Sequence, residues 1–221
     1  MKIYKQYIEN GIEYVEFGSY PQGLKRNKKI LKEKEDGYCY DDTGTKYALY
    51  IDKYYAFKPI KWRVLQKKDN HLLLMSEKVI DVYPYGSNYN YKESSIRKFL
   101  LNAFYNTAFN TLEKLIISDR ELALTNLKDK VFLMSDEDMQ NEEYGFSETF
   151  GKDENRAKEG TDYVRAKLPQ RYKNYFFYVL RSSDKKKEFL PYVCGHGLMA
   201  YKKAIEREGV CPAIWIEAKK S

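Results

Sequence analysis

The fold is decided by two stretches near the C-terminus, Tyr-Phe-Phe-Tyr-Val-Leu-Arg-Ser-Ser at residues 175–183 and Gly-Val-Cys-Pro-Ala-Ile-Trp-Ile at residues 209–216. Both are short apolar runs, rich in aromatic and β-branched side chains and bounded by Gly, Pro, Ser or charge, as buried strands are. Between them, residues 193–199 are punctuated by glycine and do not favour a helix. Because closely spaced strands follow the main helices, we predict an α+β fold rather than a doubly wound one.

Two hairpins are predicted upstream. Asn10-Gly11 and Asp69-Asn70 each separate two apolar runs, and Asn-Gly is the pair that best adopts the positive φ angles of a type I′ turn. Residues 25–45 are polar, charged and rich in turn residues, which predicts a protruding loop. We expect Ile60, Trp62 and Val64 on one face of their strand and Lys61, Arg63 and Leu65 on the other. The strands predicted in this half are residues 3–8, 12–17, 46–51, 54–57, 60–65 and 72–76.

Two main helices are predicted in the middle of the chain. Ser94 or Ser95 caps a helix whose apolar residues recur at a spacing of three and four. Asn110 and Glu113 form a capping box that starts a second helix, with Leu112, Leu115 and Ile116 as its apolar face. With no internal repeat and no long linker in the sequence, we predict one domain over residues 1–221.

Shorter elements come after the helices. Residues 130–134 are predicted to form a strand, and Ser135 with Asp138 begins a short acidic helix. Residues 145–160 are polar and glycine-bounded, and Thr161 caps a further helical turn.

Charge and cysteine content narrow the class of protein. A net charge of +7, from 39 basic and 32 acidic residues, suits an anionic partner but is modest for this length. Cys39, Cys194 and Cys211 have no CxxC spacing, so we expect free thiols in a reducing cytosol rather than a zinc site, although a Cys194–Cys211 disulfide stays open. The N-terminal residues lack the apolar core of a signal peptide, which predicts a cytoplasmic protein without a membrane partner.

Six motifs occur in a recognisable order, at residues 17–22, 59–65, 95–114, 129–135, 180–182 and 209–216. Together they resemble a bacterial family, domain of unknown function 6273, over roughly residues 13–217. The family is similar to the C-type-lectin-like fold, which includes formylglycine-generating-enzyme-type domains. The resemblance implies a single domain with an N-terminal hairpin, two main helices and an irregular antiparallel sheet, and it implies binding modules of surface or phage-associated proteins. Residue 211 is Cys where the family usually has Arg, and Phe177-Tyr178 replaces a Trp pair.

The sequence contains few candidates for catalysis. His196 lies two residues from Cys194, but side chains two apart in an extended segment require a kink to pair. His71 is expected at a strand edge. The formylglycine-generating relatives are copper oxidases that use a cysteine pair, which Cys194 and Cys211 would have to supply. The acidic clusters at 41–42 and 136–138 lack the ligand spacing of a calcium loop. We therefore expect no enzymatic activity and no cofactor.

Surface binding is the remaining hypothesis. Tyr83, Tyr85, Tyr89 and Tyr91 alternate through a loop rich in Ser, Gly and Asn, the composition of adaptable binding surfaces. We predict an interaction module that binds a protein or ribonucleoprotein, of the kind that a phage or mobile element would encode to inhibit a host defence complex (anti-CRISPR-like). Direct nucleic-acid binding, a glycan-binding lectin or phage adhesin, and a copper-dependent oxidase stay open as alternatives. The basic contact residues are predicted to be Lys25, Arg26, Lys28 and Lys29.

Three polar residues in the motifs are assigned structural roles. Arg97, Asn102 and Arg181 are expected to form buried hydrogen bonds that tie helix to sheet, because a buried polar side chain requires a partner.

Overall fold

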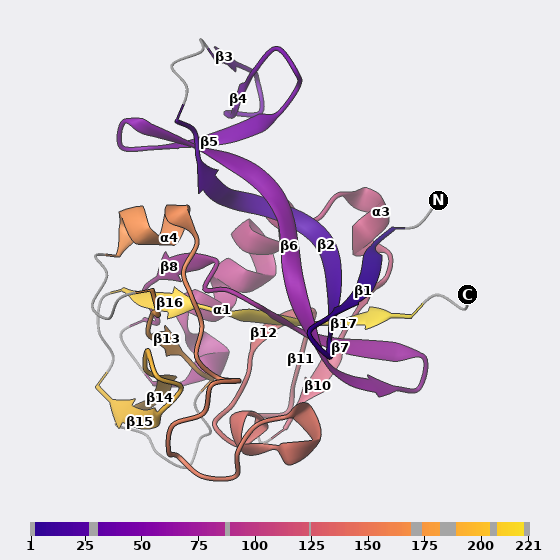
Figure 1. Ribbon diagram of the computed structural model, residues 1–221, viewed down its shortest axis with the longest axis vertical. Helices are drawn as coiled ribbons and strands as arrows, with labels where there is room; N and C mark the ends of the chain where they lie inside the picture. Colours follow the sequence, from indigo (N-terminus) through magenta and orange to yellow (C-terminus); the bar gives the residue numbers. More distant parts are fainter. Residues whose placement is uncertain are drawn as a thin grey trace.

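Two long antiparallel strands form the spine of the larger sheet, β2 (Ile12–Leu24) and β6 (Lys53–Lys68). The structure is a computed structural model that describes residues 3–26, 31–86, 89–123, 125–168, 174–181, 189–203 and 207–218. Its larger sheet runs in the order β12-β17-β7-β6-β5-β4-β3, with β1 and β6 beside β2 and β9 beside β17 (Figure 1). The other strands of this sheet are β1 (Lys5–Glu9), β3 (Lys32–Glu33), β4 (Cys39–Tyr40), β5 (Lys46–Tyr50), β7 (His71–Ser76), β9 (Ile117–Ser118), β12 (Val131–Leu133) and β17 (Pro212–Glu217).

Both predicted hairpin turns are present. Asn10 and Gly11 have φ angles of 51° and 78°, and Asp69 and Asn70 have φ angles of 47° and 59°, so both turns have the positive φ values of type I′. The strands around them are longer than predicted, because residues 54–57 and 60–65 belong to the single strand β6.

A bulge in β6 changes the predicted alternation of its side chains. The pairing with β7 shifts between Val64 and Gln66, and Leu65 is buried, so it does not share the face of Lys61 and Arg63 as predicted. A β-bulge inserts one unpaired residue and thereby shifts the alternation of the residues after it to the opposite faces. Ile60 and Trp62, which were predicted to share a face, are both fully buried.

The helical region is one continuous segment, followed by a single turn. Ser94 caps α1 (Ser95–Phe99) by accepting a hydrogen bond from the amide of Arg97 at 3.2 Å. The segment passes through a π-helical turn, Leu100–Phe104, into α2 (Tyr105–Ala108). It packs on β2, with Phe104 5.0 Å from Tyr20 and Phe109 5.2 Å from Phe17 between ring centroids.

The predicted capping box is confirmed at α3 (Thr111–Lys114), but its predicted apolar face is wrong. Leu112 and Leu115 are 52% and 72% exposed, and only Ile116, beyond the end of the helix, is buried. A helix of one turn presents too little surface to bury a full apolar stripe, so the chain turns inward only where β9 begins.

A smaller sheet carries the rest of the C-terminal half. Its order is β15-β14-β13-β16-β8, and β13 and β16 are parallel, so the predicted antiparallel pattern does not hold throughout. Residues 209–216 are two strands rather than one, because Cys211 separates β16 of the smaller sheet from β17 of the larger sheet. The strands are β8 (Asp81–Tyr83), β13 (Tyr178–Val179), β14 (Leu190–Val193), β15 (Met199–Lys202) and β16 (Glu208–Val210).

Short elements lie between the strands of the two sheets. Ser135 and Asp138 exchange hydrogen bonds as predicted, although the helix that they begin is a 3-10 turn. Thr161 caps α4 by accepting from the amide of Val164 at 3.2 Å. These elements are the 3-10 turns Tyr91–Glu93, Asp138–Gln140 and Glu142–Tyr144, the strands β10 (Arg120–Leu122) and β11 (Leu127–Asp129), and the helix α4 (Asp162–Lys167).

The described part of residues 25–45 is not an irregular loop. It contains β3 and β4, which extend together with β5 away from the rest of the molecule (Figure 1). We refer to residues 31–57, which include β3, β4, β5 and the first residues of β6, as the arm.

Two of the three polar residues predicted to tie helix to sheet do so. Arg97 binds Asp129, and Arg181 is buried and donates to the carbonyl oxygens of Leu133 and Ala123 and to Asp138. Asn102 is exposed and only donates to the carbonyl oxygen of Lys98 in its own helix, so its predicted buried role is wrong.

The buried apolar side chains form a cluster shared by both sheets and the helical segment, and the fold is α+β. In the described ranges, no helix is both long and apolar enough to span a membrane.

Candidate functional site

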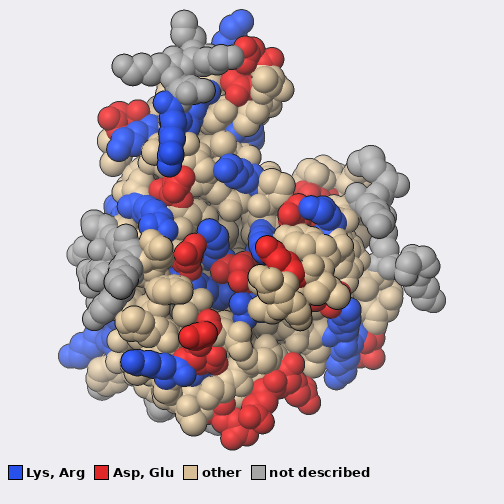
Figure 2. Space-filling model, in the orientation of Figure 1, with Lys and Arg blue, Asp and Glu red and all other residues tan. Residues whose placement is uncertain are grey.

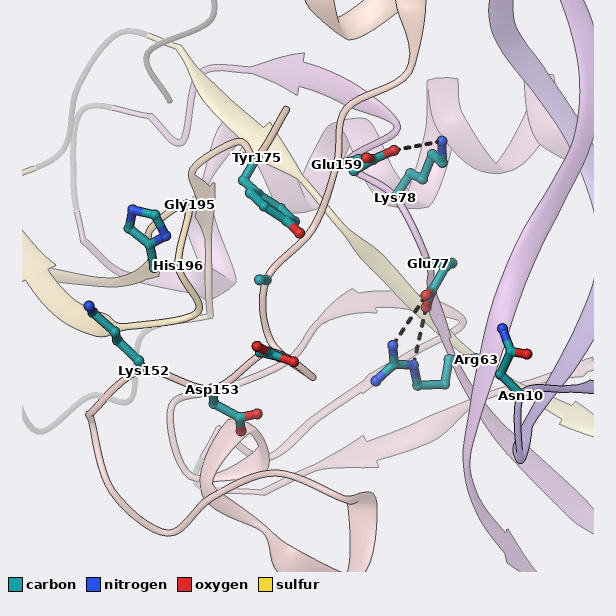
Figure 3. Close-up of a pocket in the computed structure, with 12 residues that line it drawn as sticks. Asn10, Arg63, Glu77, Lys78, Lys152, Asp153, Glu159, Tyr175, Gly195 and His196 are labelled. Carbon is teal, nitrogen blue, oxygen red and sulfur yellow. Dashed lines mark hydrogen bonds and ion pairs between the residues drawn. The ribbon is translucent and has the colours of Figure 1, made fainter. Parts of the chain in front are cut away.

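A cleft of about 960 Å³ opens between the two sheets. Figure 2 shows basic and acidic side chains together around the hollow in the middle of this face. Figure 3 shows that its walls come from distant parts of the chain, including β6, the segment after β7, the loop before α4 and the turn at His196. The lining residues are Asn10, Arg63, Glu77, Lys78, Lys152, Asp153, Glu154, Ala157, Glu159, Tyr175, Gly195 and His196.

Arg63 and Glu77 form a two-point ion pair in the cleft (Figure 3). Nε of Arg63 is 3.1 Å from Oε2 of Glu77, and Nη2 is 3.1 Å from Oε1. The hydroxyl of Tyr14 donates to the same carboxylate at 3.2 Å. Burial alone would raise the pKa of Glu77, but the positive charges of Lys158 and Arg63 lower it below its usual value. Glu77 is therefore ionised at neutral pH, and its hydrogen bonds with Arg63 and Tyr14 fix its position.

Lys158 lies beneath this pair with its side chain 2% exposed. Its Nζ is 4.0 Å from Oε2 of Glu77, which is a long ion pair for a buried amine. Burial lowers the pKa of Lys158, because removing an ammonium group from water is costly, while Glu77 opposes the shift. A fully buried amine therefore lies next to the paired carboxylate of the cleft lining.

The wall of the cleft opposite β6 is held in place by Arg156, which is fully buried. Its guanidinium donates to five backbone carbonyl oxygens, at distances of 2.7 to 3.2 Å, and so ties together the loop before α4 and the turn at His196. Gly197 completes this contact: its φ is +71°, and a Cβ there would lie 1.7 Å from the carbonyl oxygen of Asp153. The wall is thus a built structure rather than a loose loop. The five carbonyl groups belong to Met139, Ser147, Thr149, Gly151 and Gly197.

The charges in the cleft are mixed and close to balance. The lining includes the cations Arg63, Lys78 and Lys152 and four carboxylates, and Lys78 pairs with Glu159 at 3.2 Å across the mouth (Figure 3). Such a surface offers both donors and acceptors to a ligand. It does not have the uniform positive charge with which proteins bind a phosphate backbone.

The cleft continues toward the arm through two smaller hollows of about 380 and 420 Å³. Lys78 lines both the cleft and the first hollow, which also includes Asp162 and Arg165 of α4. Lys58 lines both small hollows, and the second reaches Lys25 and Arg26. We refer to the cleft and these two hollows together as the groove.

The predicted tyrosine contact surface is wrong for Tyr85 and Tyr91 and stays a prediction for Tyr83 and Tyr89. Tyr85 and Tyr91 are buried in the core, and the hydroxyl of Tyr91 accepts from the amide of Leu133 at 3.3 Å. Burial raises the pKa of Tyr91. Tyr83 is half-buried and stacks on Phe99 at 4.2 Å, and Tyr89 is half-buried against the core. The turn-rich composition of this segment serves tight packing on the core instead of an open surface.

The predicted basic residues divide into two groups. Lys25 and Arg26 line the end of the groove, and Nζ of Lys25 lies 4.6 Å from the centroid of the Tyr47 ring. Lys28 and Lys29 lie outside the described residues. Neither Lys25 nor Arg26 lines the cleft itself.

The cysteines do not fit a copper-binding pair or a disulfide. All three thiols are free, and Cys211 is buried with its Sγ directed at the carbonyl oxygen of Lys78. Burial raises the pKa of the Cys211 thiol to about 12, so it stays protonated at neutral pH and is a poor metal ligand. Cys194 lies half-buried in the turn beside His196, which is exposed. Within the described ranges, no group of three or more His, Cys, Asp and Glu side chains is arranged to hold a metal ion.

His71 is the first residue of β7, which lies between β6 and β17 inside the larger sheet, so it is at the start of a strand but not on an edge strand. Its ring stacks on Trp215 with 5.5 Å between centroids, and its Nδ1 lies 2.7 Å from the carbonyl oxygen of Asp69. This is a packing role at the start of β7.

Sequence reasoning singled out His196 but missed the other charged residues that line the cleft. Arg63 was assigned only to one face of its strand, and Glu77 and Asp153 stood out in no motif. The one available signal was the polar, glycine-bounded segment 145–160, since long connections of this kind often carry binding residues. Nothing in the local pattern brings that segment to β6 and β7.

Comparison with models of protein families assigns the chain to a family. Residues 69–218, well over half of the chain, match the family model described as Domain of unknown function (DUF6273). The chain belongs to this family. The DUF6273 match includes the cleft from Glu77 to His196, but it leaves out Asn10, Arg63, the arm and the motifs at 17–22 and 59–65. No curated protein and no solved structure matches the chain.

Proposed function

We propose that the chain is a binding module that recognises a partner protein through the groove. The observation that carries the proposal is the cleft itself: about 960 Å³, rigidly walled, and lined by cations and carboxylates in near balance. A polypeptide presents amide donors, carbonyl acceptors and side chains of both signs, so it matches such a lining. The two hollows beyond Lys78 extend the groove enough to take a segment of several residues.

The charges favour a protein over nucleic acid. Glu77, Asp153, Glu154 and Glu159 all line the cleft, and each would repel a phosphate. Lys78, the cation shared with the next hollow, is already paired with Glu159. A ribonucleoprotein partner fits equally well if its protein component enters the cleft.

For the scaffold, we propose a variant of the C-type-lectin-like fold, supported by the N-terminal hairpin and by the late strands that close both sheets. We propose cytoplasmic action and, as the biological role, inhibition of a host defence complex by a phage or mobile element (anti-CRISPR-like). Binding is supported over catalysis by the buried, protonated thiol of Cys211, which is unsuited to act as a nucleophile.

The test is affinity capture with the full chain and with paired charge-reversal variants. Lys78→Glu reverses a half-exposed cation at the junction of the cleft and the first hollow, and its side chain is 47% exposed, so folding should survive. Lys67→Glu is the matched control, because Lys67 also forms an exposed ion pair, with Glu13 at 2.7 Å, and lines none of the three hollows.

We expect a bacterial lysate to yield a stoichiometric protein that Lys67→Glu retains and Lys78→Glu loses. Nuclease treatment of the lysate separates a direct protein partner from one held through RNA. If Lys78→Glu and Lys67→Glu retained the partner protein equally well, the groove would not be its binding site. Binding to a glycan array, abolished by Lys78→Glu, would replace the protein partner with a carbohydrate one.

A further inference from the structure

The turn between β5 and β6 has an unusual residue at its first position. Tyr50 pairs with Lys53, so Ile51 and Asp52 form a two-residue hairpin turn, and Ile51 has a φ of +57°. A β-branched residue with positive φ is a true outlier, because its Cβ crowds the backbone. The other two-residue turns of the described chain use Asn10-Gly11 and Asp69-Asn70, which tolerate this conformation.

The side chain of Ile51 does not compensate for this strain by packing. It is 78% exposed, and Leu49, two residues earlier, is 56% exposed. The hairpin therefore places two large apolar side chains in water, one of them on a strained backbone. Neither feature contributes to folding, and strain of this kind persists at binding sites where the surrounding structure enforces it.

The base of the hairpin is firmly held. The ring of Tyr50 lies 5.9 Å from that of Tyr163 on α4, edge to face, and Nζ of Lys167 lies 5.6 Å from the Tyr50 centroid. Lys167 is itself paired with Asp81 at 2.5 Å. The tip is thus presented in one position, which lowers the entropy lost on binding.

The tip is also continuous with the groove. The helix α4 that supports Tyr50 contributes Asp162 and Arg165 to the first hollow, and this hollow meets the cleft at Lys78. A partner that fills the groove would pass over α4 and meet the tip. Figure 1 shows the β5–β6 hairpin projecting above α4.

We propose that Leu49 and Ile51 form an apolar anchor that inserts into an apolar pocket on the partner protein. This inference rests on the proposed function and adds a second contact to it. Asp52 and Lys53 follow Ile51, are both exposed and carry opposite charges, so the tip fits a pocket with a rim of both signs. The same neutrality removes the attraction to anionic lipid that a membrane-inserting tip uses.

The first test separates stability from binding. Ile51→Gly removes the apolar side chain and relieves the strained φ, so its melting temperature should equal or exceed that of the wild type. Its affinity for the captured partner should fall at least tenfold, since buried apolar anchors dominate interface energetics. Ile8→Thr, at another exposed isoleucine (73%) on β1, is the matched control and should bind as the wild type does.

The second test uses a photoreactive probe. Replacing Ile51 with p-benzoylphenylalanine should give one cross-linked product in the lysate, with the cross-link on an apolar segment of the captured protein. The same probe at Glu121, which is exposed on β10, should give none.

The outcomes distinguish the two proposals. Wild-type affinity for Ile51→Gly, with binding lost in Lys78→Glu, would overturn the anchor and leave the groove. The reverse pattern would overturn the groove and leave the anchor. Flotation of the wild type with phosphatidylglycerol vesicles, lost in Ile51→Gly, would overturn a protein pocket as the target of the tip.

Discussion

Arg97 and Asp129 form a two-point ion pair that joins the main helical segment to the β10–β11 hairpin. Nε of Arg97 is 2.8 Å from Oδ2 of Asp129, Nη2 is 2.6 Å from Oδ1, and the Asp129 side chain has no exposed surface. The contact spans 32 residues of chain. It therefore couples two elements that share no local sequence pattern.

Removing Arg97 should destabilise the fold strongly. Arg97→Ala leaves the buried carboxylate of Asp129 without its partner, and we expect a loss of about 3 kcal/mol in the free energy of unfolding. Asn102→Ala, in the same helical segment, removes only an exposed contact and should change it by less than about 0.5 kcal/mol. Urea unfolding of the two variants checks this, and similar losses for both would contradict the role assigned to Arg97.

Arg156 should not be replaceable by lysine. Lysine keeps the charge but lacks the planar fork that reaches five carbonyl oxygens, so we expect Arg156→Lys to cost about 2–4 kcal/mol. Arg207→Lys, at an exposed position, should be close to neutral. Thermal unfolding followed by circular dichroism compares the two, and an unchanged melting temperature for Arg156→Lys would show that charge alone holds the wall.

Gly197 should tolerate no side chain. Gly197→Ala combines a disfavoured φ with a Cβ only 1.7 Å from the carbonyl oxygen of Asp153, so the wall of the cleft must shift. Gly145→Ala has a similar φ of +80° but no atom within 4 Å of the new Cβ, and it should cost only about 1 kcal/mol. The first variant should lose clearly more stability than the second in the same urea titration. Equal losses would mean that the backbone conformation, not the close contact, sets the requirement.

Lys158 should reduce stability at neutral pH. Burial lowers its folded pKa below the usual value of 10.5, so the folded state binds this proton less tightly than the unfolded state. The loss of folding stability that the buried ammonium group causes is complete below the pKa of Lys158 in the folded state. This loss disappears as the pH rises to 10.5, the pKa of the unfolded state. Lys158→Met should therefore be about 1 kcal/mol more stable than the wild type near pH 7, because Glu77 keeps its pairing with Arg63.

The pH dependence of this difference is the decisive measurement. The stability gap between Lys158→Met and the wild type should narrow as the pH approaches 10.5, the usual pKa of a lysine. A gap that widens toward high pH would contradict a lowered pKa at Lys158. Lys152→Met, which removes an exposed lysine from the cleft lining, is the control.

The three thiols should react at different rates with a thiol reagent at about pH 8. Cys194 is half-buried and should react first, whereas Cys211 is buried with its pKa raised to about 12 and Cys39 is buried with a raised pKa. Burial is the main cause of both shifts. We expect one fast equivalent in the native protein and three after unfolding. Cys194→Ser should remove the fast phase, and a fast phase that survives this substitution would place a reactive thiol elsewhere.

Local features of the structure were readable from the sequence. The turns at Asn10-Gly11 and Asp69-Asn70, the cap at Ser94 and the capping box of Asn110 with Glu113 all depend on residues within a few positions of one another. Their conformations follow from steric preference and from hydrogen bonds between neighbours, which require no knowledge of the rest of the chain.

Burial was decided by the tertiary structure. Tyr85 and Tyr91 were predicted at the surface and lie in the core, whereas Leu112 and Leu115 were predicted in the core and lie at the surface. Both patterns were ambiguous locally, because tyrosine serves cores and surfaces alike and a one-turn helix shows almost no periodicity. Only the packing of the other elements determines which side chains lose contact with water.

The candidate site was also decided by the tertiary structure. Arg63, Glu77, Asp153 and His196 come from segments up to 133 positions apart, between Arg63 and His196, and they meet only because β6, the arginine-tied loop and the 195–197 turn converge. The sequence alone determined the α+β class, the hairpins and the caps, since these follow from local preference. The tertiary structure alone decided the cleft and the exposed, strained tip at Ile51, since both depend on contacts between residues that the sequence keeps far apart.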